Sequence, residues 1–279
     1  MSLTMGTAPF GHAPAGTFND AVNTDGQVIW WEDSPRRVRG MLGGETVVDS
    51  TRVKLLHEKG LLPKWYFPLE DVRADLLEPT DHHTRCPFKG EASYFTVTAG
   101  GRTAENAAWH YPEPIEGMEH IAGHVSFYFD KLDEWWEEDE RAFVHPRDPY
   151  HRVDVLSSSR HVRVSLDGET LAESANAKAL FETGLPTRWY FPLEDVDTAK
   201  LTARDLHTSC PYKGTTDRYY DGPGEDAIAW VYEEALPAVT GIEGRVAFFN
   251  ERVDLDVDGE RETRPESPFS RRDWATRSH

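Results

Sequence analysis

Cysteine is scarce in this sequence, with two residues in 279. Two cysteines cannot form the disulfide framework on which small secreted domains rely. Basic residues are also few, because 30 lysines and arginines face 49 aspartates and glutamates, which gives a formal net charge of -19. So acidic a chain is poorly suited to nucleic acid or to an anionic membrane surface, and we expect neither as a partner.

Long apolar runs are absent as well. No stretch of the sequence approaches the roughly 18 apolar residues that a membrane-spanning helix requires. The first residues, MSLTMGTAPFGHAPAGTFND, lack the basic segment followed by an apolar segment that marks a secretory signal. We therefore expect a soluble, cytoplasmic protein.

An internal repeat is the most informative feature that is present. The run WYFPLEDV occurs twice without change, at Trp65 to Val72 and at Trp189 to Val196. A shift of 124 residues also aligns HTRCPFKG with HTSCPYKG, and after a deletion of three residues AAWHY aligns with IAWVY. A period of this length indicates two tandem domains rather than a solenoid, whose repeats run about 20–50 residues. The expected boundaries are 22–140 for the first domain, 141–152 for a linker, 153–262 for the second domain and 263–279 for a C-terminal tail.

Strand patterns dominate each copy. In RHVRVSLDGETLAES, the apolar residues Val162, Val164 and Leu166 alternate with other residues and precede a turn pair, Asp167-Gly168, which predicts a hairpin with a type I′ turn. NAKALFETGLP is ambiguous between a short helix and a buried strand. FPLEDV, with proline at its start and acids in its first turn, predicts a helix of one to two turns. We predict a mainly β fold of two tandem small antiparallel β-domains, each a sheet that curls or closes around an aromatic core, with short helical turns.

Two proline-bearing segments follow the two copies. HPRDPYHR in the linker recurs in looser form as RPESPFSR at Arg264 to Arg271. Either the segments pack as extended arms against the domains that they follow, or they form a solvated linker and tail.

At WYFPLEDV, HTxCPxKG, AAW and VxFxF the sequence resembles the domain of unknown function 427 family, here in tandem. The resemblance covers about Val28 to Asp133 and Val153 to Asp254. It implies a compact all-β domain similar to the β-tent group, and it implies no established activity. Zinc-binding β-tent proteins use paired CxxC motifs, which one cysteine per copy cannot supply. A nucleotidyltransferase label attached to the family gains no support, because the Gly-Ser dipeptide expected of that class is absent.

The Cys-Pro block holds the candidate catalytic residues, Cys86 and Cys210. In each copy a His, a Thr, a Cys and a Lys fall within HTxCPxKG. A thiol near a cation can have its pKa lowered and then acts as a nucleophile or a redox centre. The alternative is that both cysteines anchor a loop, since cysteine is among the most buried residue types, and this is the commoner use.

A metal site is not expected in this block. His83 and Cys86 form an HxxC pair, but zinc requires three or four protein ligands. The additional histidines of the first copy, His110 and His124, are replaced by valine and arginine in the second. We expect no metal and no cofactor.

The repeated aromatic residues supply candidate ligand contacts. Most of them should pack in the core, because adjacent strand residues point to opposite faces of a sheet. An outward-pointing member, together with the cation at its edge and the residues of the Cys-Pro block, would line a pocket for a small anionic or aromatic ligand. The candidate ligand-binding residues are Lys64, Trp65, Tyr66, His83, Lys89 and Trp109 in the first copy, and Arg188, Trp189, Tyr190, His207, Lys213 and Trp230 in the second.

Three functions stay open on the sequence. The first is small-ligand binding in a pocket lined by the WYFP and CPxKG blocks. The second is a thiol-dependent enzyme that uses the cysteine of CPxKG, and the third is a structural or protein-interaction module, with a homodimer as one arrangement. The first copy, which is richer in histidine, is favoured as the active one.

Overall fold

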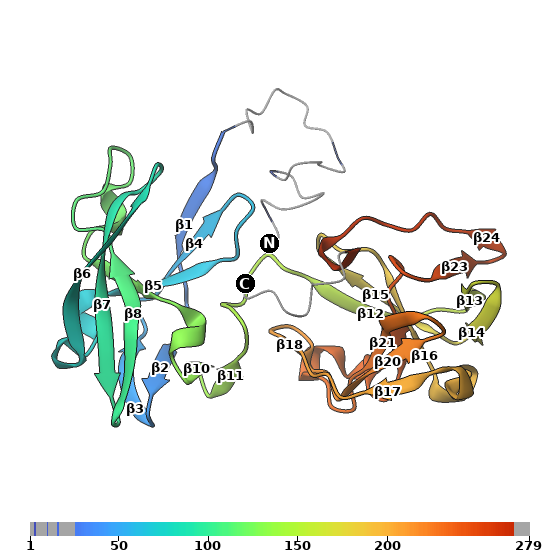
Figure 1. Cartoon of the computed structure of the whole chain (residues 1–279). Coiled ribbons are helices and arrows are strands. Elements are labelled where there is room, and N and C mark those ends of the chain that lie inside the picture. The colour runs from blue at the N-terminus through green and yellow to red at the C-terminus, as the bar shows by residue number, and fades with distance from the viewer. Residues whose placement is uncertain (1–2, 4–9, 11–15, 17–25, 271–279) are drawn as a thin grey trace. The chain divides into compact units, whose positions relative to one another are not determined.

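The computed structural model describes residues 3, 10, 16 and 26–270. The chain divides into two compact units between Asp148 and Pro149 (Figure 1), and each unit contains one copy of the repeat. The described helices are short 3₁₀ segments, and none of them combines the length and the apolar character that a membrane crossing requires.

The first domain consists of two antiparallel sheets with an apolar core between them. The strand order is β1-β4-β5-β9-β8-β7-β6 in the large sheet and β11-β10-β2-β3 in the small sheet. The large sheet is open, with β1 and β6 at its edges. The strands are β1 (Ile29–Asp33), β2 (Val38–Leu42), β3 (Glu45–Ser50), β4 (Lys54–Glu58), β5 (Lys64–Pro68), β6 (Leu77–Cys86), β7 (Gly90–Ala99), β8 (Arg102–His110), β9 (His124–Phe127), β10 (Glu134–Glu137) and β11 (Glu140–Ala142). The 3₁₀ turns are η1 (Leu69–Asp71), η2 (Ala74–Leu76), η3 (Glu119–Ile121) and η4 (Phe129–Lys131).

The second domain repeats this topology. Its large sheet has the order β12-β15-β16-β22-β21-β20-β17, its small sheet the order β14-β13-β23-β24, and β18 pairs with β19. The strands are β12 (Val153–Ser157), β13 (Val162–Leu166), β14 (Glu169–Ser174), β15 (Lys178–Glu182), β16 (Arg188–Phe191), β17 (Thr202–Arg204), β18 (Ser209–Cys210), β19 (Gly214–Thr215), β20 (Arg218–Gly222), β21 (Glu225–Val231), β22 (Val246–Phe248), β23 (Asp254–Val257) and β24 (Glu260–Arg261). The 3₁₀ segments are η5 (Leu193–Asp195), η6 (Thr198–Lys200), η7 (Pro237–Ile242) and η8 (Pro268–Ser270).

The predicted fold class is confirmed in its main features. The protein is mainly β, antiparallel and duplicated, and its described helices are short turns. The expected hairpin joins β13 to β14 through Asp167 and Gly168, whose φ values of 50° and 84° fit a type I′ turn. The ambiguous segment NAKALFETGLP contains strand β15, and the predicted helix in FPLEDV is the single turn η5. The large sheets remain open rather than closing into a barrel.

The large sheet of each domain carries an apolar layer on both faces. In the first domain Trp65 and Phe67 pack between the two sheets, whereas Tyr66, which separates them in the sequence, packs on the other face of the large sheet. In the second domain Trp189 packs between the sheets and Tyr190 on the opposite side. The alternation of side chains along a strand produces this division. We call the side of the large sheet that faces away from the small sheet the outer face.

Part of each proline-bearing segment contacts the domain that it follows, as the extended-arm alternative predicts, whereas His151 of the first segment stacks on Tyr212 of the second domain. In the first domain His145 and Asp148 are buried, and Asp148 Oδ2 lies 3.9 Å from Nδ1 of the buried His57. In the second domain the ring of Phe269 lies 5.7 Å from the ring of Phe249, measured between centroids.

Candidate functional site

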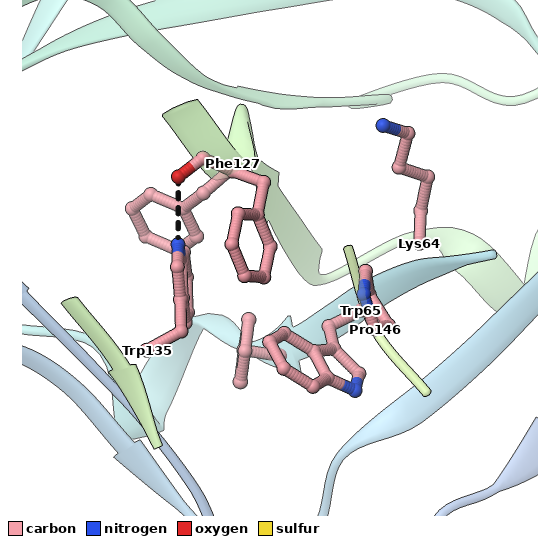
Figure 2. A pocket seen from close by; sticks show the side chains of 7 residues that line it. Lys64, Trp65, Phe127, Trp135 and Pro146 are labelled. Carbon is pink, nitrogen blue, oxygen red and sulfur yellow. Dashed lines mark hydrogen bonds between the residues drawn. The ribbon is translucent and has the colours of Figure 1, made fainter. Parts of the chain in front are cut away.

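Trp65 belongs to the tightly packed layer between the sheets of the first domain. Its ring lies 5.4 Å from Trp135 and 6.0 Å from Phe129. The cavity among these rings has a volume of about 10 Å³, which is barely enough for one water molecule. Lys64, the preceding residue, points away from the rings (Figure 2). The tryptophan of the WYFP block therefore lies in the core, apart from the Cys-Pro block.

Five ionisable side chains gather on the outer face of the first domain. We call them the thiol cluster: Glu58, Tyr66, Cys86, Lys89 and Tyr111. Lys89 Nζ donates a hydrogen bond to Glu58 Oε1, and both side chains are buried. The same ammonium lies 5.9 Å from the centre of the Tyr111 ring. Cys86 is half-buried beside this layer, and burial raises the pKa of Tyr66 well above its ordinary value, with Tyr111, Glu58 and Cys86 contributing.

The second domain has the same cluster. Its members are Glu182, Tyr190, Cys210, Lys213 and Tyr232. Lys213 Nζ donates to Glu182 Oε2, and His151 Nε2 lies 3.0 Å from Glu182 Oε1. Burial opposes the charges of this pair, but Lys213 and His151 hold the pKa of Glu182 at about 2. In the same way, burial opposes the ammonium of Lys213, yet Cys210 and Glu182 keep its pKa above the ordinary value.

The turn that follows each cysteine explains the spacing of the CPxKG block. Gly90 has a φ of 113°, and a Cβ atom there would lie 3.2 Å from the carbonyl oxygen of Glu113. Only glycine adopts such a conformation without strain. The turn is fixed by the backbone bond from Ile115 N to Lys89 O at 3.1 Å. Glycine thus lets the chain reverse directly after Lys89, whose side chain enters the buried layer.

The two histidines of the block are exposed and contact groups other than the thiols. His83 and Cys86 are three residues apart in the regular part of strand β6, so their side chains point to opposite sides. His83 is largely exposed, with Nδ1 lying 3.3 Å from Ser93 Oγ. His207 is also exposed, and its Nδ1 lies 2.9 Å from the Thr216 carbonyl oxygen. His83 is therefore not placed to take a proton from Cys86, and Nε2 of His207 lies 3.1 Å from Asp205 Oδ1.

Next to the thiol cluster, the outer face of the first domain carries further aromatic residues. The rings of Tyr94 and Trp109 lie 6.5 Å and 4.6 Å from the ring of Tyr128. The hydroxyl oxygen of Tyr94 also lies 2.9 Å from Thr84 Oγ1. Burial and the Tyr94 hydroxyl raise the pKa of Tyr128 to about 12. This group places tyrosine hydroxyls and a tryptophan ring side by side.

The cations next to these rings differ between the domains. Arg188 is 3% exposed, and its guanidinium donates to both carboxylate oxygens of Glu251 at 2.7 and 2.8 Å. Its counterpart Lys64 is half-buried and makes neither a hydrogen bond nor an ion pair with any described residue. Burial lowers the pKa of Lys64, while Asp130 and Glu58 counteract this from beyond ion-pair distance. Among the described residues, the first domain therefore holds an unpaired cation where the second holds a saturated one.

A wider depression of about 450 Å³ lies next to the Cys-Pro loop of the first domain. It is open to solvent, and neither Cys86 nor Lys89 contributes to its wall. Its lining residues are Arg85, Gly90, Glu91, Pro112, Glu113 and Ile115. Across the described ranges, no three His, Cys, Asp or Glu side chains are arranged to hold a metal ion.

The sequence reasoning missed the acid and the second tyrosine of each thiol cluster. Glu58 aligns with Glu182 at the 124-residue shift, and Tyr111 aligns with Tyr232 in AAWHY and IAWVY. Identity between the copies at these positions was the available signal. Of the candidates, Tyr66, Cys86, Lys89 and Trp109 share the outer face, as do their counterparts in the second domain.

Comparison with known proteins agrees with the duplicated architecture. A family model described as a domain of unknown function (DUF427) matches the chain twice, over residues 30–138 and 154–259. No match is found among the curated proteins. The two matched ranges cover most of the chain and coincide with the two domains of the structure. The chain therefore belongs to the DUF427 family and carries two copies of its domain.

Proposed function

We propose that the protein binds a small anionic ligand on the outer face of its large sheets, with the cysteine at the edge of the site. The observation that supports this proposal is the thiol cluster, which both domains retain as a partly exposed cysteine beside a buried lysine-glutamate pair. Buried ion pairs are seldom needed for stability, because apolar residues of similar volume serve as well. A retained cation next to an accessible thiol is therefore a reason to infer recognition.

Binding is favoured over thiol catalysis by the position of the histidines. A catalytic cysteine normally relies on a base within hydrogen-bond reach. His83 lies on the other side of its strand from Cys86, and the two ring nitrogens of His207 contact the Thr216 carbonyl oxygen and Asp205 Oδ1. The lysines beside the cysteines are already paired with Glu58 and Glu182. The cluster thus places a cation beside each thiol, whereas the histidines of the Cys-Pro block are engaged with other groups.

Alkylation of the native protein tests the proposal. Iodoacetate and iodoacetamide present the same electrophile with and without a negative charge, and mass spectrometry reads Cys86 and Cys210 separately. We expect the ratio of the iodoacetate rate to the iodoacetamide rate at Cys86 to exceed the ratio in the urea-unfolded chain by about tenfold, since a local cation raises the concentration of anions.

The matched control is the double variant Lys89→Met/Glu58→Gln, which removes both charges of the pair without leaving one buried alone. Its ratio at Cys86 should fall toward the unfolded value, while the ratio at Cys210 should stay unchanged. Thiols that react only after unfolding, or ratios equal to that of the unfolded chain at both cysteines, would contradict an anion site on this face.

A further inference from the structure

The outer face of the second domain is occupied by a side chain from its own C-terminal arm. The ring of Phe269 lies 5.7 Å from the ring of Phe249, and Arg188 Cζ lies 5.9 Å from the centre of the Phe269 ring. The carbonyl oxygen of Phe269 accepts a hydrogen bond from Arg252 Nη2 at 3.3 Å. A phenyl ring and an oxygen acceptor are thus held together between an aromatic side chain and two arginines.

The first domain has the same framework with lysines in place of both arginines. Lys64 corresponds to Arg188 at the 124-residue shift, and Lys131 corresponds to Arg252 at the shift of 121 residues that applies after the deletion. Lys131 Nζ donates to the carbonyl oxygens of residues 105 and 106 at 2.6 and 3.3 Å. Arg252 Nη1 donates to those of the corresponding residues 226 and 227 at 3.0 and 3.2 Å. The two cations therefore have the same anchorage.

The aromatic position is free on the described part of the first domain. Tyr128 takes the place of Phe249, and within this part its ring contacts are with Tyr94 and Trp109. No ring of this part of the first domain lies on Tyr128 as Phe269 lies on Phe249. Tyr128 itself is half-buried, so part of its ring is accessible.

The cations at this free surface retain capacity to bind. Lys64 has no hydrogen-bonding or ion-pairing partner among the described residues. Lys131 uses its ammonium for two carbonyl oxygens, and an ammonium group has three donors. Lys131 also lies 5.3 Å from the centre of the Tyr128 ring. In the second domain Arg188, the counterpart of Lys64, donates to Glu251, and Arg252, the counterpart of Lys131, donates to the Phe269 carbonyl oxygen.

We propose that the outer face of the first domain binds an arylalkanoate, a small molecule in which a short aliphatic chain joins an aromatic ring to a carboxylate. The ring lies on Tyr128, as Phe269 lies on Phe249, and the carboxylate pairs with Lys131 and Lys64. In the second domain the C-terminal arm fills the equivalent place, so that domain does not take the ligand. This inference rests on the proposed function and specifies the class of its ligand.

Two physical reasons favour this ligand class. Hydrogen bonds from an ammonium group to a carboxylate are about twice as strong as neutral ones, and aromatic rings gain further stability from offset or edge contacts. The chain as a whole carries a net charge of -19, which repels anions. Binding of an organic anion to this protein therefore depends on local cations such as Lys64 and Lys131.

Isothermal titration of the full chain with phenylacetate is the first experiment. Acetate, which lacks the ring, and phenylethanol, which lacks the charge, are the matched probes. We expect one phenylacetate to bind per chain and both matched probes to bind at least about tenfold more weakly. Lys64→Met and Lys131→Met should each weaken phenylacetate binding by about tenfold, because each removes a charge-assisted hydrogen bond.

Two further variants make the result decisive. Lys178→Met removes a lysine charge from the second domain, where Lys178 Nζ donates to Ser157 Oγ, and should leave the affinity unchanged. Phe269→Ala removes the ring from the second domain but leaves Arg188 paired with Glu251 and Arg252 bonded to the backbone carbonyl of residue 269, so the number of bound phenylacetate molecules should stay at one. Lys64 is unpaired among the described residues and Lys131 is exposed, so circular dichroism should show both methionine variants folded.

Absence of saturable phenylacetate binding by the natural chain would overturn the inference, as would binding that neither lysine variant weakens. The alkylation ratio at Cys86, measured on the same preparation, separates this failure from that of the proposed function. A retained preference for iodoacetate without phenylacetate binding rejects the arylalkanoate alone. Loss of both results rejects the anion site itself.

Discussion

Replacement of Lys213 by methionine removes the cation from the buried pair of the second domain. Lys213 and Glu182 are 9% and 8% exposed, so the carboxylate that remains stays out of water. The folded domain holds the pKa of Glu182 at about 2 against an ordinary value of 4.5, a difference worth about 3 kcal/mol at neutral pH. Removal of one partner of a buried pair costs about 3–5 kcal/mol. We therefore expect Lys213→Met to lower the free energy of unfolding of this domain by about 3 kcal/mol.

The loss should depend on pH with a definite sign. Because the pKa of Glu182 is lowered on folding, its contribution is fully present above about pH 4.5 and is lost as the pH falls toward 2. In Lys213→Met the carboxylate remains buried without its main cation, so it takes up a proton at higher pH than in the natural protein. The difference in stability between the two proteins is therefore largest at neutral pH and smaller at about pH 5.

A double variant isolates the charge effect from the packing effect. In Lys213→Met/Glu182→Gln no charge of the pair is left buried, and the glutamine oxygen still accepts the hydrogen bond that His151 gives to Glu182. We expect its stability to lie within about 1 kcal/mol of that of the natural protein, with little dependence on pH.

Hydrogen exchange read by mass spectrometry measures the stability of each domain separately. Peptides from β21 and β22 report on the second domain, and peptides from β8 and β9 of the first domain serve as an internal control. A loss below about 1 kcal/mol in the single variant, or a double variant no more stable than the single one, would refute the argument. An equal loss at neutral and acidic pH would do the same.

Two further predictions concern packing and backbone strain. Gly40 lies opposite Trp135, and a Cβ atom at Gly40 would lie only 2.6 Å from that ring, whereas the second domain places Val164 opposite Leu255. Gly40→Val should therefore lower the free energy of unfolding by about 1–3 kcal/mol. The double variant Gly40→Val/Trp135→Leu should lose less, and thermal unfolding that shows no such recovery would mean that the two positions are not coupled. Ala227 has a φ of 49°, a backbone conformation that glycine adopts more easily than alanine. Ala227→Gly should therefore stabilise the second domain by about 0.5–1 kcal/mol in denaturant titrations, and a lower unfolding midpoint would argue against strain at this residue.

Local sequence rules accounted for much of the fold. Asp167-Gly168 between alternating runs predicted the hairpin, and the identity of WYFPLEDV in both copies predicted two tandem domains. The segment around Lys178 to Glu182 stayed ambiguous, because a short apolar run has no periodicity of its own and becomes a strand by pairing with its neighbours. The opposite orientations of Trp65 and Tyr66 follow from strand alternation alone.

The sequence alone could not show which distant groups meet. Glu58 and Lys89 are 31 residues apart, and they pair although β4 and β6 lie near opposite edges of the large sheet and are not neighbours in it. Periodicity assigns a residue to a face, but the course of the sheet and its turns in three dimensions decides which residues of that face meet.

The sequence by itself determined the duplication, the mainly β class and the opposite orientations of adjacent aromatic residues in each WYFP block, because these depend on local spacing. Only the tertiary structure decided that Lys64 is unpaired among the described residues while Arg188 is paired with Glu251, and that Phe269 packs on the outer face of the second domain. These differences arise from contacts between segments far apart in the chain. Whether such contacts form depends on the balance between chain entropy and packing, and no local sequence pattern predicts that balance.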